Sequence, residues 1–169
     1  LTAQIKEFEN KIIFLKGNPN KFRELKIEER VVKLTELCET LYKESILNDS
    51  SKNFIQDHKL ESFVVRFQYI HGLSGKDLRP IVDSAKKEIK KVLVFVFSET
   101  DKKLSLAVGV SDTLVDKFDA SFFAKQISSL INGKGGGGRK DFAQAGGEIQ
   151  SNIKSIYEFI LNEIKNIRK

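Results

Sequence analysis

The sequence predicts a mixed α/β (α+β) protein, in which an N-terminal helical hairpin arm is followed by a small sheet covered by helices. Apolar residues recur every three or four positions over much of residues 1–52, as in amphipathic helices. Alternating or continuous apolar runs, typical of strands, then occupy residues 61–70, 92–97 and 104–110. Helical spacing returns between and after these runs, which is the order expected for a sheet covered by helices.

Residues 1–52 form the first predicted domain, a coiled-coil-like helical hairpin. One apolar stripe ends at Leu15, the next begins at Ile27, and the turn-forming residues Gly17–Asn20 lie between them. Two helices joined in this way cover each other's apolar faces. The single cysteine, Cys38, falls on the second stripe and is expected to pack there as a small apolar residue. The arm is therefore predicted to be structural or to mediate homo-oligomerisation.

Residues 53–169 form the second predicted domain, a globular α/β unit. After its first strand, a helix is expected to start near Arg79 or to be kinked by Pro80, and the spacing leaves both alternatives open. The fully apolar run 92–97 indicates a central strand, joined to the next strand by a hairpin loop at residues 98–103. Further helices are predicted from about residue 112, over residues 121–131, and from residue 149 to the C-terminal end.

Composition favours a soluble, cytoplasmic protein with a basic second domain. The longest apolar run is far shorter than the roughly 20 residues that cross a bilayer, so no membrane partner is expected. The formal net charge is +6, and residues 53–169 carry 19 Lys and Arg against 14 Asp and Glu. A basic excess of this kind suits a nucleic-acid partner. The chain contains no methionine and begins at Leu1, so we expect it to be a piece of a longer protein.

The sequence offers no catalytic constellation and no metal-ligand set. One cysteine and two histidines cannot assemble a usual zinc site. His58 and His71 have no nucleophile motif beside them and are expected at the surface. Gly133, Gly135 and Gly138 satisfy a GxGxxG pattern, but a predicted helix precedes them where a dinucleotide site needs a strand. We therefore expect this chain alone to be no enzyme and to hold no cofactor.

The most informative segment is the Gly-rich loop 133–147, which holds seven of the eleven glycines. Lys134, Arg139 and Lys140 lie beside glycines whose amide groups no side chain shields. Together they could form a cradle for phosphate or sugar oxygens, although a flexible surface loop is an equally open interpretation. Phe142 is the one aromatic residue that we consider for stacking on a base or ribose.

This loop resembles a family signature. The sequence GKGGGGRKDFAQAGG is similar to the segment near the C-terminus of alanyl-tRNA synthetases, in the DHH-associated domain that closes these enzymes. Upstream, LSGKDLRPIVDSAKKEI and KKLSLAVGVSDTL are similar to a helix and a strand of the same domain, so the resemblance covers about residues 60–169. It implies a non-catalytic domain that binds the outer corner, or elbow, of tRNA(Ala) and assists aminoacylation and editing. The rest of the synthetase chain would be its partner and would use ATP, Mg and Zn.

Carried over residue by residue, the resemblance implies tRNA contacts along the loop. They are Lys134, Gly135, Gly136, Gly137, Gly138, Arg139, Lys140, Phe142, Gln144, Gly146 and Gly147. The loop departs from the family pattern by one additional glycine after Lys134 and by Lys140 in place of the usual proline. Two other functions stay open: the substrate-binding domain of a DHH-type phosphoesterase, whose histidine-containing loop this chain lacks, and an oligomerisation module formed by residues 1–52.

Overall fold

The computed structural model describes residues 2–47 and 53–168. Contacts between Cα atoms divide the chain into two units, residues 1–50 and 51–169. The predicted end of the arm at residue 52 lies outside the described residues. The described part has five α-helices and a six-stranded sheet, so the predicted α/β (α+β) fold class is confirmed.

The first unit is a pair of helices, α1 (Thr2–Phe14) and α2 (Ile27–Leu47). Helix α1 ends where the Gly17 amide donates a hydrogen bond of 2.8 Å to the carbonyl of Ile12, a common C-terminal cap. The two apolar stripes face each other, as the spacing predicts. The buried residues of this small core are Ile5, Ile12, Leu34 and Cys38.

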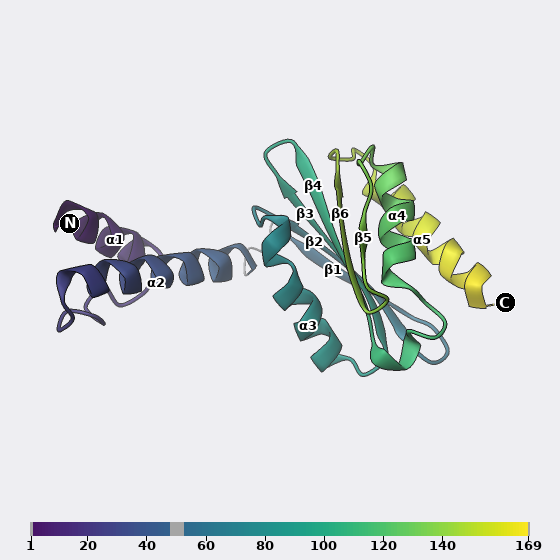
Figure 1. Cartoon of the computed structure of the whole chain (residues 1–169), viewed down its shortest axis with the longest axis horizontal. Helices are drawn as coiled ribbons and strands as arrows, with labels where there is room; N and C mark the ends of the chain where they lie inside the picture. Colours follow the sequence, from purple (N-terminus) through teal and green to yellow (C-terminus); the bar gives the residue numbers. More distant parts are fainter. Residues whose placement is uncertain (1, 48–52, 169) are drawn as a thin grey trace. The chain divides into compact units, whose positions relative to one another are not determined.

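The second unit is built on the sheet, whose strand order is β1-β2-β3-β4-β6-β5 (Figure 1). Strands β2 and β3 are parallel, and the other neighbouring strands are antiparallel. The strands are β1 (Phe54–Lys59), β2 (Val64–His71), β3 (Val92–Thr100), β4 (Lys103–Val110), β5 (Gly137–Gly138) and β6 (Phe142–Gly147).

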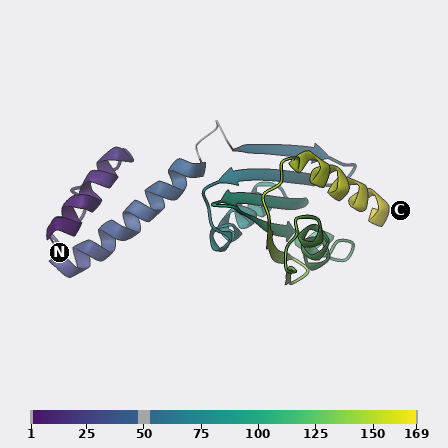
Figure 2. The ribbon, with the colours of Figure 1, turned by 90° about the horizontal axis from the view of Figure 1, so that it is seen from above.

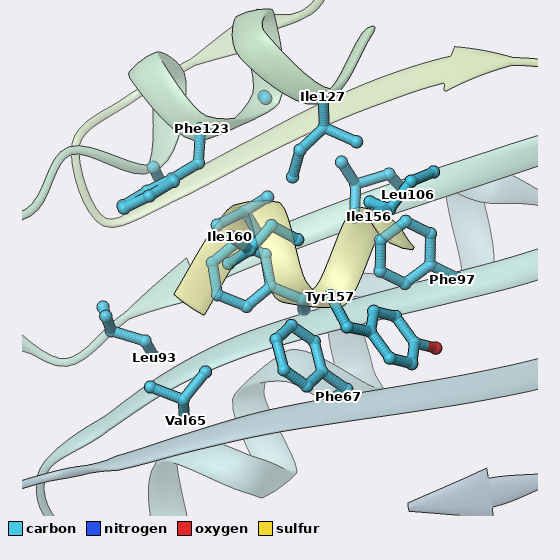
Figure 3. Packing of buried hydrophobic residues seen from close by; sticks show 14 of the residues in the cluster. Val65, Phe67, Leu93, Phe97, Leu106, Phe123, Ile127, Ile156, Tyr157 and Ile160 are labelled. Atoms are coloured by element: carbon cyan, nitrogen blue, oxygen red, sulfur yellow. The ribbon is translucent and has the colours of Figure 1, made fainter. Parts of the chain in front are cut away.

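Helices cover both faces of the sheet. Helix α3 (Arg79–Glu88) covers one face, and α4 (Ala120–Leu130) and α5 (Ile153–Arg168) cover the other (Figure 2). The main core lies under α4 and α5, where alternate residues of the central strands meet apolar residues of the two helices (Figure 3). The rings of Phe67 and Tyr157 stack there with their centres 4.3 Å apart. This core holds the sheet in place, and the Gly-rich segment forms one edge of that sheet.

The prediction that residues 133–147 form a loop is wrong. Strands β5 and β6 lie inside this segment, and β6 extends the sheet by pairing with β4, with Ala143 opposite Val108. Glycine has a low intrinsic propensity for strands, but pairing with a neighbouring strand overrides that propensity here. The segment is therefore the edge of the sheet, and only its turns are loop.

Five other points of the predicted fold are corrected or decided. Strand β1 was not predicted. Strands β3 and β4 continue into the expected loop 98–103 and leave a two-residue turn in which Lys102 has a φ of 63°. The segment from residue 112 is a single 3₁₀ turn, and the last helix begins at residue 153. Pro80 lies in the first turn of α3, where its missing amide costs no helical hydrogen bond, so the helix starts there without a kink.

Candidate nucleic-acid interface

The Gly-rich segment begins in a turn that the end of α4 holds in place. The amide of Gly133 donates a hydrogen bond of 2.8 Å to the carbonyl of Ser128, and the amide of Gly135 donates one of 3.0 Å to the Ser128 hydroxyl. Gly135 has a φ of 114°, a conformation that favours glycine. Two amides of the expected phosphate cradle are therefore bonded within the protein. Ser128, which is buried, was not singled out in the sequence.

Several glycines allow backbones and side chains to approach closely. Gly137 is an exception, because a Cβ atom there would meet nothing within 4 Å. The close contacts at the other glycines explain much of the glycine content of the segment by the packing of the fold alone. An added Cβ atom would be too close to a neighbour at four of these positions. At Gly133 it would lie 2.1 Å from the Gly146 carbonyl oxygen, and at Gly136 it would lie 2.8 Å from the Ala145 Cβ atom. At Gly138 it would lie 2.5 Å from the Phe142 carbonyl oxygen, and at Gly147 it would lie 2.4 Å from Ile131.

Cations flank the edge strand β5. Lys134 precedes the strand and Arg139 and Lys140 follow it, and all three side chains are exposed. The Arg139 Nε atom lies 3.7 Å from a carboxylate oxygen of Asp141, so this cation is partly neutralised. The exposed Gly137 lies between the two groups of cations. The structure thus presents a glycine strand, open to solvent, with positive charge at both ends.

Phe142 and Gln144 lie on β6, half-buried, on the face of the sheet that α3 covers. The Arg79 guanidinium carbon lies 5.0 Å from the centre of the Phe142 ring. The Gln144 Nε2 atom donates a hydrogen bond of 2.8 Å to the carbonyl of Gly75. Sequence reasoning missed Arg79 and Gly75 as parts of this site, because they precede it by more than fifty residues. The sequence signal for both residues was the upstream segment LSGKDLRPIVDSAKKEI, which contains them and resembles the same family.

Gly146 is exposed and Gly147 half-buried, and both line a hollow beside the turn. The hollow has a volume of about 500 Å³. It carries two cations, Lys103 and Lys134, with backbone and small side chains between them. Its charge and shape suit an anionic group such as a phosphate. The lining residues are Lys103, Leu104, Ser105, Asn132, Gly133, Lys134, Gly135, Gly146 and Gly147.

A buried arginine, Arg66, lies on the face of the sheet that α3 covers, but it has a structural role. Arg66 is 7% exposed and donates hydrogen bonds to both Asp57 and Glu88. The hydrogen bond from Arg66 lowers the pKa of the Asp57 carboxyl group and that of Glu88 below their usual values. Because these carboxylates occupy its donors, Arg66 is not available to a ligand.

Within residues 2–47 and 53–168, no three side chains of His, Cys, Asp or Glu gather as a metal site would require. None of the described helices combines the length and apolar composition that a bilayer crossing needs.

The DHHA1 domain model matches residues 62–166, so the chain belongs to the DHHA1 domain family. The resemblance to the DHH-associated C-terminal domain of alanyl-tRNA synthetases is confirmed by sequence relatives and by a solved structure. Alanine–tRNA ligase of Thermotoga maritima is 37% identical over 137 residues, which are 80% of this chain and 16% of the ligase. That of Mesorhizobium japonicum is 44% identical over 79 residues, 46% of this chain and 9% of the ligase. The chain therefore spans a small part of the ligases that it matches.

Among solved structures, the chain is similar to the C-Ala domain of alanyl-tRNA synthetase from Aquifex aeolicus. The TM-score is 0.58 at 28% sequence identity, and the alignment covers 64% of this chain and 96% of that domain. The similarity therefore includes nearly all of the C-Ala domain.

Proposed function

We propose that this chain is the RNA-binding C-terminal domain of an alanine–tRNA ligase and that it binds the outer corner of tRNA(Ala) in the cytoplasm. The observation that carries the proposal is the glycine edge strand β5 with exposed Lys134, Arg139 and Lys140 around it, in a chain whose relatives are alanine–tRNA ligases. Aminoacylation and editing, with their ATP, Mg and Zn, would be carried out by the rest of the synthetase.

The chemistry of the segment favours recognition of phosphate positions over base identity. Glycines allow a nucleic-acid backbone to approach the strand closely, and lysine and arginine neutralise phosphates. The segment has few side chains that could distinguish base edges, and contacts with phosphates carry no sequence information. A folded RNA with a characteristic shape, such as the tRNA corner, is the target that fits such a surface.

The test is a titration of the whole chain with a tRNA(Ala) transcript at two salt concentrations. Replacing Lys134, Arg139 and Lys140 by Ala should reduce the slope of log K against log salt by about 0.7–0.9 for each lost phosphate contact. The matched control is the triple replacement of the exposed Lys117, Lys125 and Lys154, which lie outside the Gly-rich segment. Equal slopes in the two triple variants would refute the role of the segment.

A second titration identifies the part of the RNA that is bound. An acceptor-stem hairpin retains a duplex but lacks the D- and T-loops that form the corner. The chain should bind the whole tRNA more tightly than the hairpin at matched salt, and changes in acceptor-stem sequence should have little effect. Equal affinity for the hairpin and the whole tRNA would contradict corner binding.

The hairpin unit supports a second candidate function, self-association. Phe14 is 86% exposed, Ile13 59% and Tyr42 56%, and an exposed cluster of apolar side chains is typical of an interaction surface. An apolar hollow of about 540 Å³ lies beside Phe14 and Tyr42. Sedimentation velocity over a range of concentrations should show a dimer or larger species. Replacing both Phe14 and Tyr42 by Glu should dissociate that species. A monomer at every concentration would contradict this candidate.

A further inference from the structure

Arg79 differs from Lys86 and Arg139, two other cations beside β6, in how its donors are used. Lys86 donates a hydrogen bond of 2.8 Å to the carbonyl of Asp141, and Arg139 lies near the carboxylate of the same residue. Arg79 is exposed, its guanidinium carbon lies over the Phe142 ring, and within residues 2–47 and 53–168 its side chain forms no hydrogen bond or ion pair. It forms no ion pair with Asp83, the acidic residue one turn further along α3. No acceptor in the part of the chain that the structure describes therefore occupies the N–H donors of Arg79.

The position of Arg79 is fixed by contacts on both sides of it. Upstream, the Gly75 carbonyl accepts the hydrogen bond from Gln144. Downstream, Val82 lies so close to the sheet that a Cβ atom at Gly109 would be 2.3 Å from the Val82 Cγ1 atom. The first turn of α3 is thus held against β4 and β6, and the Phe142 ring orients the guanidinium that this turn projects.

We infer that Arg79 contacts a phosphate of the bound RNA and that Phe142 is a positioning residue for it, an inference that rests on the proposed function. A guanidinium lying over an aromatic ring is attracted by the ring face and keeps its donors free at its edges. Those donors match two oxygens of one phosphate. The RNA surface then includes the start of α3 as well as the Gly-rich segment.

The inference changes the role expected for Phe142. A ring that stacks on a base or ribose needs an open face, but Arg79 lies over the Phe142 ring, and the residue is half-buried on β6. Gln144 likewise uses its amide to hold Gly75. Both residues, which the sequence placed among the tRNA contacts, would act by placing Arg79.

The experiment is a double-mutant cycle on the whole chain, with binding to a tRNA(Ala) transcript as the readout. Arg79→Ala should weaken binding about tenfold and reduce the salt slope by about 0.7–0.9. Arg79→Lys should keep the slope but lose part of the affinity, because an ammonium lacks the planar fork. Phe142→Leu should weaken binding only when Arg79 is present, and Phe142→Tyr, which keeps the ring, should bind as the unchanged chain does.

Lys125→Ala, which removes one exposed cation from α4, is the matched control and should leave binding unchanged. Equal losses from Arg79→Ala and Lys125→Ala would overturn the inference while leaving the proposed function intact if the triple variant of the Gly-rich segment still binds weakly. Additive losses from Arg79→Ala and Phe142→Leu would return Phe142 to direct RNA contact. No binding of the unchanged chain to tRNA at low salt would overturn both the inference and the proposed function.

Discussion

The hydroxyl of Ser128 accepts a hydrogen bond of 3.0 Å from the amide of Gly135, across the turn that joins α4 to the Gly-rich segment. The carbonyl of the same serine accepts the Gly133 amide. One buried residue therefore shapes the turn through two bonds, and the glycines between α4 and β5 follow a path set by the protein itself. A phosphate could bind to this turn only through groups that these bonds leave available.

Ser128→Ala should reduce the free energy of unfolding by about 1–2 kcal/mol, because it removes the partner of the Gly135 amide. Ser129 is the matched control, since it is exposed and its hydroxyl donates only to the carbonyl of Lys125 in the same helix. Ser129→Ala should therefore change stability by less than about 0.5 kcal/mol. Denaturant titration of both variants measures the difference, and equal effects would show that the Ser128 bond does not stabilise the turn.

Gly133→Ala should destabilise the protein, whereas Gly137→Ala should leave its stability unchanged. At Gly133 the added methyl group would lie 2.1 Å from the Gly146 carbonyl oxygen, so Gly133→Ala should destabilise the protein by about 1–3 kcal/mol or more. At Gly137 the methyl group meets nothing, so Gly137→Ala should leave thermal stability unchanged.

The same pair tests the RNA surface. If a nucleic-acid backbone approaches β5 closely, Gly137→Ala should weaken tRNA binding although the protein remains as stable as before. Thermal melting and the tRNA titration, made on the same preparation, separate the two effects. Unchanged binding in Gly137→Ala would show that the RNA does not approach this strand closely.

Much of the fold was predictable because its signals are local. The stripes of α1 and α2 and the apolar run of β3 are periodic patterns that need no knowledge of distant residues. Strand β1 was missed because its sequence, FIQDHK, is largely polar and exposed, and it forms by pairing with β2. Strand β6 was missed for a similar reason: its partner β4 lies more than thirty residues upstream.

The candidate site was predictable only where one segment contains it. Lys134, Arg139 and Lys140 follow from the Gly-rich motif, and the structure exposes all three. Arg79 reaches the site through a contact with Phe142 that spans 63 residues, which no periodicity encodes. Ser128 was equally hidden, since composition does not distinguish the serine that turns inward from its exposed neighbour.

Cys38 should react slowly with thiol reagents in the folded chain. Its side chain is 9% exposed, its Sγ atom donates a hydrogen bond of 3.4 Å to the Phe8 carbonyl, and burial raises the pKa of the thiol. Because the thiolate is the reactive form, alkylation near pH 8 should be at least about tenfold slower than in the unfolded chain. Mass spectrometry after timed iodoacetamide treatment, with and without guanidinium chloride, measures the ratio. Equal rates would show that the hairpin opens freely.

The ion pairs of Arg66 should make stability depend on pH in the acid range. The hydrogen bond from Arg66 holds the pKa of Asp57 below its usual value in the folded state. A carboxyl group of this kind binds protons more readily in the unfolded chain, so its contribution to stability is fully present above the unfolded pKa, about 3.9 for Asp. The contribution is lost as the pH falls from about 5 through the folded pKa.

Asp57→Asn should therefore reduce the free energy of unfolding by about 1 kcal/mol at neutral pH, a modest loss because solvent screens a side chain that is 36% exposed. The variant should also lose less stability than the unchanged chain between about pH 5 and pH 3, since one of the groups that titrates is gone. The control is Asp116→Asn, which removes an exposed carboxylate elsewhere in the same unit. Denaturant titrations across this range give both curves. If the Asp57→Asn and Asp116→Asn variants follow the same acid profile, the Arg66 pair does not contribute to stability, and the buried guanidinium must be held by Glu88 alone.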